Sequence, residues 1–138
     1  MEKKLKAQSQ ITFLYYYELD TPGKFYQDVM GFELIEDQGT ARIYRVCGNA
    51  HLGIVNQATG FHRAQPTNAV EITLVVDDVE PWYQHLKSKG VKFLREPIIK
   101  GKTVHSHNTF VIEDPGGYTI EVQQFLIPET AAMYVDPK

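Results

Sequence analysis

The sequence contains a single cysteine, Cys47, so no disulfide bond can form within the chain. A lone cysteine with no second cysteine or histidine at metal-ligand spacing fits a reducing compartment. Long apolar runs are also missing, since no stretch approaches membrane-spanning length. The lysine-rich residues 1–6 are followed by polar residues and not by the apolar segment of a signal peptide. We therefore expect a cytoplasmic protein that does not enter a membrane.

A concentration of basic residues is the next missing feature. Lysines and arginines are scattered, and the formal net charge of the 138 residues is −3. A protein that follows a phosphate backbone normally carries a basic stripe, so we expect no nucleic-acid partner. The length and the ordinary apolar content suit one domain with a real core. A small molecule is the expected partner.

The first half of the chain predicts a strand, a helix and three more strands. Residues 11–17 are a β-branched and aromatic run, which favours a strand. Asp20 or Thr21 can cap a helix that has Pro22 in its first turn, and Gly31 follows this helix. Further apolar runs predict strands at residues 32–36, 41–46 and 51–55.

The second half repeats this order. Asp77 and Asp78 precede a helical segment that ends at Gly90, and its Trp82-Tyr83 pair corresponds to Phe25-Tyr26 in the first helix. Apolar runs predict strands at residues 69–76, 91–94, 104–112 and 118–125. We therefore predict one domain made of module one (9–57), a linker (58–68), module two (69–126) and an unassigned C-terminal tail (127–138).

This order predicts an α+β fold of two tandem β-α-β-β-β modules. One helix covers only one face of a four-stranded sheet, so each module leaves a sheet face uncovered. Two curved mixed sheets can then enclose a shared cavity between their uncovered faces. That cavity is the expected ligand site.

The two-residue period of a strand indicates which side chains line the cavity in module one. On the first strand, Phe13 and Tyr15 alternate inward with Ile11. The hairpin at Gly48-Asn49 is expected to place Arg42, Tyr44, His51 and Gly53 on the cavity face, and Ile43, Leu52 and Ile54 beneath the helix. Aromatic rings beside an arginine and histidines suit an aromatic or anionic ligand. Core packing is the alternative interpretation of the rings.

The same period applies to the last hairpin of module two. Phe110 and Ile112 are expected beneath the helix with Ile120 and Val122. The cavity face then receives His105, His107, Thr109, Val111, Glu121 and Gln123. Solvent exposure is the alternative interpretation of the two histidines.

Several segments carry a resemblance to a known family. Gly31-Phe32-Glu33, Val75-Val76-Asp77-Asp78 and, most specifically, residues 114–121 (Asp-Pro-Gly-Gly-Tyr-Thr-Ile-Glu) occur in its order and spacing. From Ile11 to about Phe125 the chain resembles the vicinal oxygen chelate superfamily, which includes glyoxalase I, bleomycin resistance proteins and extradiol dioxygenases. The resemblance implies paired β-α-β-β-β modules and a homodimer.

The resemblance also implies four metal-ligand positions, which fall on Ile11, Gly53, Glu71 and Glu121. Ile11 and Gly53 have no side-chain donor, whereas a zinc site normally needs three protein ligands. We therefore predict no metal ligands and no cofactor. Glu71 and Glu121 with waters remain a possible weak site for Mg²⁺ or Mn²⁺.

Three functions fit these observations. The leading hypothesis is a glyoxalase/bleomycin resistance/dioxygenase superfamily protein that binds a small aromatic or anionic ligand in the inter-module cavity without a complete metal site. The alternative is a metal-assisted lyase, isomerase or dioxygenase-like enzyme with Glu71 and Glu121 as catalytic residues. A third hypothesis is a catalytically silent protein whose dimer interface is its function.

Overall fold

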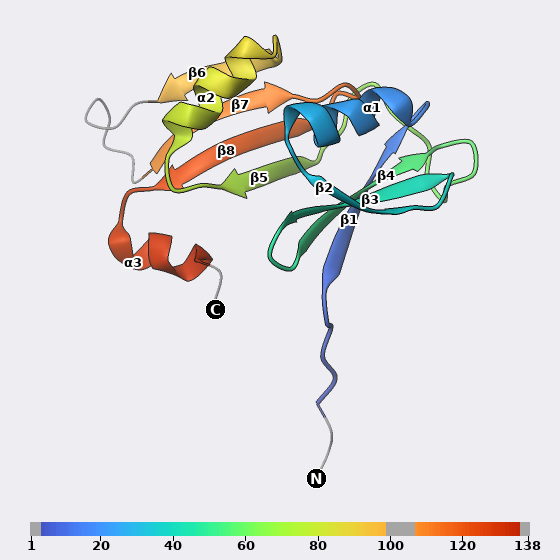
Figure 1. The fold of residues 1–138 in the computed structure, drawn as a ribbon, viewed down its shortest axis with the longest axis horizontal. Coiled ribbons are helices and arrows are strands. Elements are labelled where there is room, and N and C mark those ends of the chain that lie inside the picture. Colours follow the sequence, from blue (N-terminus) through green and yellow to red (C-terminus); the bar gives the residue numbers. More distant parts are fainter. Residues whose placement is uncertain (1–3, 99–106, 136–138) are drawn as a thin grey trace. The chain divides into compact units, whose positions relative to one another are not determined.

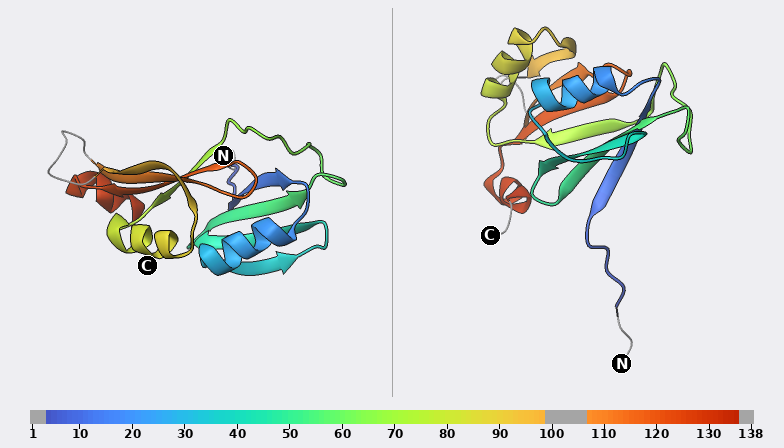
Figure 2. Two further views of the ribbon diagram at one scale, coloured as in Figure 1. Left: turned by 90° about the horizontal axis from the view of Figure 1, so that it is seen from above. Right: turned by 45° about the vertical axis from the view of Figure 1, so that its right-hand side comes forward.

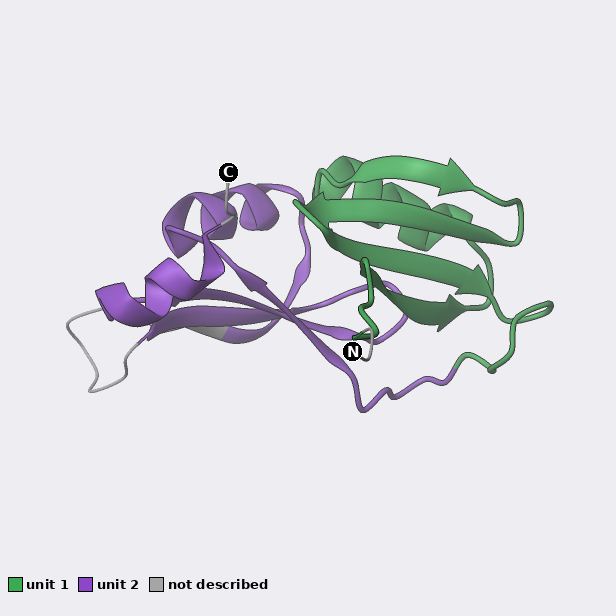
Figure 3. Ribbon diagram, turned by 90° about the horizontal axis from the view of Figure 1, so that it is seen from below, with its two compact units in different colours: residues 1–64 green, residues 65–138 purple. Residues whose placement is uncertain are grey.

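The structure, a computed structural model, describes residues 4–98 and 107–135. The chain divides into two compact units, unit 1 (Met1–Ala64) and unit 2 (Gln65–Lys138), which are coloured separately in Figure 3. No helix in the described residues is long and apolar enough to cross a membrane.

Unit 1 is a four-stranded sheet with one helical segment. Its elements are β1 (Gln10–Tyr16), α1 (Asp20–Lys24), the π-helical η1 (Phe25–Val29), β2 (Glu33–Asp37), β3 (Ala41–Cys47) and β4 (Ala50–Asn56) (Figure 1). The strand order is β1-β4-β3-β2, with β1 parallel to β4 and the other pairs antiparallel.

Unit 2 has the same architecture. Its elements are β5 (Glu71–Val75), α2 (Val79–Ser88), β6 (Lys92–Ile98), β7 (His107–Glu113), β8 (Thr119–Phe125), α3 (Pro128–Ala131) and the 3₁₀-helical η2 (Ala132–Tyr134). The strand order β5-β8-β7-β6 repeats that of unit 1, again with one parallel pair, β5 and β8. The predicted α+β class with two β-α-β-β-β modules is confirmed.

The helix starts differ in one respect from the prediction. The Asp78 side chain caps α2 by accepting the N–H of Glu80 at 3.0 Å, as expected. At α1, however, the acceptor is the Glu18 carboxylate, 2.7 Å from the N–H of Asp20. Asp20 itself lies inside the first turn, and its carboxylate bonds Arg42 instead. The predicted cap at Asp20 or Thr21 is therefore wrong.

In unit 1 the core lies between the α1-η1 segment and one face of the sheet (Figure 2). Tyr26 of η1 is 1% exposed, and its ring contacts those of Phe25, Phe32 and Tyr44. The sheet contributes the buried residues Leu14, Tyr16, Tyr44, Leu52 and Ile54. In each unit we call the sheet face opposite α1-η1 or α2 the helix-free face; in unit 2, α3 and η2 pack over the end of this face at Phe125.

In unit 2 the core lies between α2 and its sheet. Leu86 of α2 is fully buried, and the Tyr83 ring contacts those of Phe93 and Phe110. The sheet contributes Leu74, Phe110, Ile112, Ile120 and Val122. Because β7 pairs Phe110 with Val122 and Ile112 with Ile120, these side chains share the face toward α2, as predicted.

Candidate functional site

Glu121 is held by two threonines on the helix-free face of unit 2. Its carboxylate accepts hydrogen bonds from Thr73 Oγ1 on β5 at 3.2 Å and from Thr109 Oγ1 on β7 at 2.8 Å. The register explains this arrangement, since Thr73 is the strand partner of Glu121 and Thr109 is the partner of Gln123. We call Glu121, Thr73 and Thr109 the carboxylate clamp.

The clamp leaves acceptor capacity on the carboxylate. An ionised carboxylate offers about four lone-pair directions, and two are used by the threonine hydroxyls. Thr109, which donates to one of the two oxygens, is 1% exposed, while Glu121 remains partly accessible. A ligand group that donates hydrogen bonds can therefore bind a carboxylate whose orientation is already fixed.

Glu71 lies on the same face of unit 2 as Glu121. It opens β5 two residues before Thr73, and its strand partner is Thr119. The two glutamates are thus on paired strands but offset by two residues, or roughly 7 Å along the strand. Glu71 is exposed, so the structure gives its carboxylate no fixed position comparable to that of Glu121.

The other predicted contacts of unit 2 follow the same face. Gln123 is the strand partner of Thr109, and His107 pairs with Phe125, whose ring lies 6.4 Å from the imidazole. Val111 is the partner of Glu121 itself. The sheet face predicted for these residues of the β7-β8 hairpin is therefore correct. His105 lies outside the described residues.

In unit 1, a ring occupies the space of a missing side chain. Phe13 and Gly53 are partners on the parallel strands β1 and β4. A Cβ placed on Gly53 would overlap the Phe13 ring at Cδ1 and Cε1. Phe13 therefore fills the volume into which a metal ligand at position 53 would have to extend.

Tyr15 and His51 share the helix-free face of unit 1 with Phe13. His51 is the strand partner of Ile11, and its Nδ1 lies 2.9 Å from the hydroxyl of Ser9. The Tyr15 ring makes an edge contact with His62 at 5.2 Å. The strand faces predicted for Phe13, Tyr15 and His51 are correct. Their predicted role in ligand binding stays a prediction.

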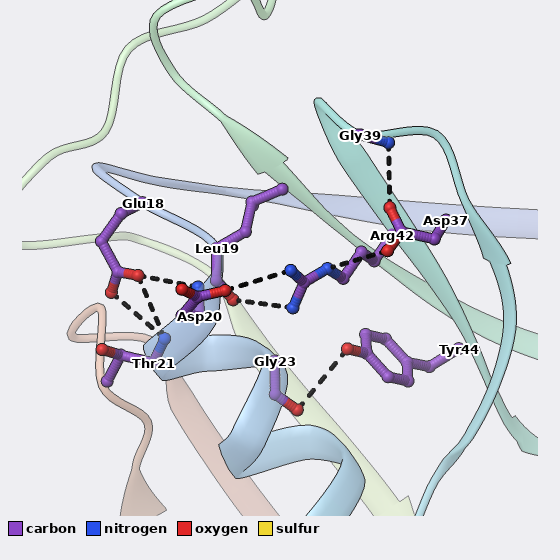
Figure 4. A network of polar contacts seen from close by, with 9 residues as sticks. All are labelled: Glu18, Leu19, Asp20, Thr21, Gly23, Asp37, Gly39, Arg42 and Tyr44. Carbon is purple, nitrogen blue, oxygen red and sulfur yellow. Dashed lines mark hydrogen bonds and ion pairs between the residues drawn. The ribbon is translucent and has the colours of Figure 1, made fainter.

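Arg42 and Tyr44 lie on the opposite face from the one predicted. The Tyr44 ring is fully buried against Tyr26, and its hydroxyl donates to the carbonyl oxygen of Gly23 at 3.5 Å. The Arg42 guanidinium bonds Asp20 at 3.1 Å and the Leu19 carbonyl at 3.4 Å, as Figure 4 shows. Both residues thus join the helix to the sheet.

The charges around Arg42 are matched within unit 1. Its Nε lies 3.5 Å from the carboxylate of Asp37, in addition to the bond with Asp20. Burial lowers the pKa of Arg42, but the hydrogen bonds to Asp20 and Tyr44 and the charge of Asp37 outweigh burial and raise the pKa overall. Burial raises the pKa of Tyr44. Two carboxylates of unit 1 thus already pair with the guanidinium, which leaves less attraction for an anionic ligand, although the buried Nε makes no hydrogen bond to any described residue.

A β-bulge causes this reversal. Cys47 pairs with Ala50, but the next pair along the hairpin is Arg45 with His51, which leaves Val46 as an extra residue on β3. An inserted residue shifts the register by one and moves every following side chain to the other face.

The shift places Ile43 and Tyr44 on the sheet faces opposite to those predicted for them. Ile43, expected beneath the helix, is the partner of Gly53 on the helix-free face, whereas Tyr44 is the partner of Leu52. Arg45, which the sequence did not single out, lies with His51 on the helix-free face. Its Nε bonds Glu33 at 3.2 Å and its Nη1 bonds the Gly48 carbonyl at 3.0 Å.

Thr73 is the other contact that sequence reasoning missed. The signal was available, because the two-residue period that places Glu71 on this face also places Thr73 there. Its partner Glu121 then identifies the hydroxyl as a hydrogen-bond donor.

The side chains at the four implied metal positions do not fit a transition metal. Ile11 and Gly53 supply no donor atom in unit 1, and the ring of Phe13 covers Gly53. In unit 2 the Glu121 carboxylate is directed to two hydroxyls. Within residues 4–98 and 107–135, no group of three or more His, Cys, Asp or Glu side chains is arranged to hold a metal ion.

Comparison with known proteins identifies the family to which this sequence is related. Residues 12–122 match the family described as Glyoxalase/Bleomycin resistance protein/Dioxygenase superfamily. A search of curated protein sequences found no match.

Solved structures show the same fold at low identity. A glyoxalase/bleomycin resistance protein/dioxygenase from Nocardioides has a TM-score of 0.73 and 14% identity over 91% of this chain and 88% of that one. Lactoylglutathione lyase from Agrobacterium tumefaciens has a TM-score of 0.68 and 21% identity, with coverages of 88% and 96%.

A third similar structure is the genomically encoded fosfomycin resistance protein of Listeria monocytogenes. Its TM-score is 0.71 at 12% identity, over 91% of this chain and 98% of that one. At these identities the structures show the fold alone, while the family match covers most of the sequence. The chain therefore belongs to the glyoxalase/bleomycin resistance protein/dioxygenase superfamily.

Proposed function

We propose that this protein binds a small organic molecule on the helix-free face of unit 2, with the Glu121 carboxylate as the anchor and without a bound metal. The carboxylate clamp is the observation that supports the proposal, because Thr73 and Thr109 fix the acceptor before any ligand arrives. A fixed acceptor reduces the entropy lost on binding. Gln123 and Val111, on the same face, are the proposed neighbouring contacts.

The proposed ligand carries a hydrogen-bond donor and an apolar or aromatic body. A hydroxyl or amide N–H satisfies the free lone pairs of Glu121, and a donor to a charged acceptor contributes more than a neutral pair. The anionic ligand expected from Arg42 has lost its support, since that guanidinium is paired with Asp20 and Asp37. We therefore favour a neutral aromatic ligand.

In unit 1 we propose that an aromatic surface takes part in ligand binding. Phe13 is 40% exposed on the helix-free face, which also carries Tyr15, Ile11 and His51. Exposed rings of this kind bind planar apolar groups through burial and stacking. We propose that the rings of Phe13 and Tyr15 contact aromatic ligands.

A ligand screen with matched variants tests this function. Small neutral aromatic compounds with one hydroxyl or amide are screened by ligand-observed NMR, and each hit is titrated by calorimetry. We expect Glu121→Gln to weaken binding about tenfold, because a charged acceptor is lost. Glu80→Gln on α2 is the control, since it removes the same charge from the other side of the sheet.

Equal weakening in both variants would mean that net charge, and not the clamp, governs binding. Unchanged affinity in Glu121→Gln would reject Glu121 as the anchor. Turnover of a hit that is abolished by both Glu71→Gln and Glu121→Gln would instead support the lyase, isomerase or dioxygenase-like alternative. Homodimerisation stays a prediction, which sedimentation velocity tests.

A further inference from the structure

Unit 2 contains a pocket at its C-terminal end that the proposed function does not use. Its volume is about 340 Å³, within the usual range for small-molecule sites. Its lining includes Val75, Val76, Asp77, Phe125, Ala131 and Tyr134. We call it the C-terminal pocket. Figure 1 shows α3 beside the ends of β5 and β8, which run in the same direction.

Two stacked rings form one wall of the pocket. Phe125 at the end of β8 and Tyr134 of η2 have centroids 4.9 Å apart and planes inclined by 9°. Tyr134 is nevertheless 56% exposed, so the stack does not bury the whole ring. An accessible face of such a ring attracts cations through its quadrupole.

Among the described residues, Asp77 is the only charged one that lines the pocket. Its neighbour Asp78 caps α2, whereas the exposed Asp77 carboxylate makes no hydrogen bond or ion pair with any described residue. The remaining lining residues are apolar apart from the tyrosine hydroxyl. The pocket thus combines one negative charge with an apolar and aromatic wall.

The pocket is separate from the carboxylate clamp. Phe125 lies four residues beyond Glu121 on β8, or roughly 13 Å along the strand. None of the clamp residues lines the pocket. A ligand in this pocket would therefore not compete for the Glu121 carboxylate.

We propose that the C-terminal pocket binds a small organic cation that has an apolar or aromatic body and one amino or ammonium group. The cationic group pairs with Asp77 and lies near the Tyr134 ring, while the apolar body contacts Val75, Phe125 and Ala131. Charge complementarity selects the cation, because an anion is repelled by Asp77 and a neutral molecule gains no ion pair.

Three compounds of similar shape test the proposal on the full chain. Phenethylamine is the cationic probe, 2-phenylethanol is its neutral counterpart and phenylacetate is the anionic one. Each is titrated while the backbone amide signals of Val76, Asp77, Phe125 and Tyr134 are followed by NMR. We expect phenethylamine to shift these signals and to bind about threefold or more tightly than the alcohol, with phenylacetate weakest.

Two variants and one control identify the residues responsible. Asp77→Asn should weaken phenethylamine binding about threefold or more and abolish the preference over the alcohol. Tyr134→Leu keeps an apolar side chain but removes the ring, and should weaken the amine more than the alcohol. Glu129→Gln, an exposed charge change on α3 outside the pocket, should leave binding unchanged.

The preference for the amine should also fall as salt is added, since an exposed ion pair is screened. Equal affinities for amine and alcohol would overturn the proposal, as would an Asp77→Asn variant that binds the amine like wild type. Shifts confined to residues outside the C-terminal pocket would overturn it too. The affinities are taken from the signals of the C-terminal pocket alone, so binding of a probe at Glu121 does not enter the comparison and the proposed function is tested independently.

Discussion

The ring of Phe13 occupies the space that a side chain at Gly53 would need. The two residues are partners on adjacent parallel strands, and the backbone of Gly53 does not adopt a left-handed conformation. The glycine is therefore required by the neighbouring ring and not by its own backbone. The contact can be tested because the effect of Gly53→Ala on stability should change sign when the Phe13 ring is removed.

Gly53→Ala should lower the free energy of unfolding by about 1 kcal/mol, because the new methyl group displaces the Phe13 ring. In a Phe13→Ala background the clash is gone. There the same substitution should raise stability by about 0.4–1 kcal/mol, since alanine restricts the unfolded chain. Urea unfolding of the four proteins in a double-mutant cycle measures both values. An equal effect of Gly53→Ala in the two backgrounds would contradict the contact.

Arg42→Ala should lower the melting temperature without changing ligand affinity. Its guanidinium connects β3 to the start of α1 through Asp20 and the Leu19 carbonyl. Loss of these contacts should cost about 1 kcal/mol, a small value because Asp20 is largely exposed. Thermal melts and calorimetry with any hit from the ligand screen give both results. Reduced affinity at unchanged stability would restore Arg42 as a ligand contact.

The cap of α1 should make stability depend on acidity. Hydrogen bonds from the side chain and N–H of Thr21, with a further bond from the N–H of Asp20, lower the pKa of Glu18 in the folded protein below its ordinary value of 4.5. A lowered pKa stabilises the fold above the unfolded-state pKa, and this contribution disappears as the pH falls through the folded-state pKa.

Glu18→Gln should therefore be less stable than wild type at about pH 6 and should approach it at about pH 3. Urea unfolding at both pH values measures the difference. The control is Glu129→Gln, which changes an exposed glutamate in the first turn of α3. A stability difference between Glu18→Gln and wild type that is the same at both pH values would show that the carboxylate does not cap the helix.

The two threonines of the clamp should contribute unequally. Thr109 is 1% exposed and its hydroxyl lies 2.8 Å from Glu121, whereas Thr73 is exposed and lies at 3.2 Å. Thr109→Val should weaken binding of a screened ligand about fivefold, and Thr73→Val should weaken it less, because water can replace an exposed donor. Calorimetry on both variants checks the order. The reverse order would mean that Glu121 is not held from β7.

The faces of the two hairpins were predicted with different success, because one hairpin contains a β-bulge and the other does not. In unit 2, β7 and β8 pair without a bulge, so counting in twos from the apolar residues placed Val111 opposite Glu121 correctly. In unit 1 the extra residue Val46 shifts the pairing by one. Arg42 and Tyr44 were therefore assigned to the wrong face.

No sequence signal marks that bulge. A tight turn at Gly48-Asn49 is compatible with regular pairing, and the choice depends on how Tyr44 packs against Tyr26 and Gly23. The burial of a large aromatic residue under the helix favours the shifted register. Packing between distant segments decided the outcome, which a local pattern does not contain.

The tail shows a second limit of the sequence. Residues 128–134 have no clear period in the sequence, yet they form α3 and η2, and α3 contacts β8. The stacking of Tyr134 on Phe125 accounts for their position. Short helices of this kind depend on tertiary contacts more than on their own propensity.

Calorimetry of one confirmed ligand, in buffer with EDTA and in buffer with added Mn²⁺, Ni²⁺ or Zn²⁺, tests the central claim most directly. The claim is that Glu121, fixed by Thr73 and Thr109, binds an organic ligand without a metal. We predict the same dissociation constant in every buffer for wild type, and about tenfold weaker binding for Glu121→Gln in each. Binding that requires added metal and is lost in EDTA would contradict the account.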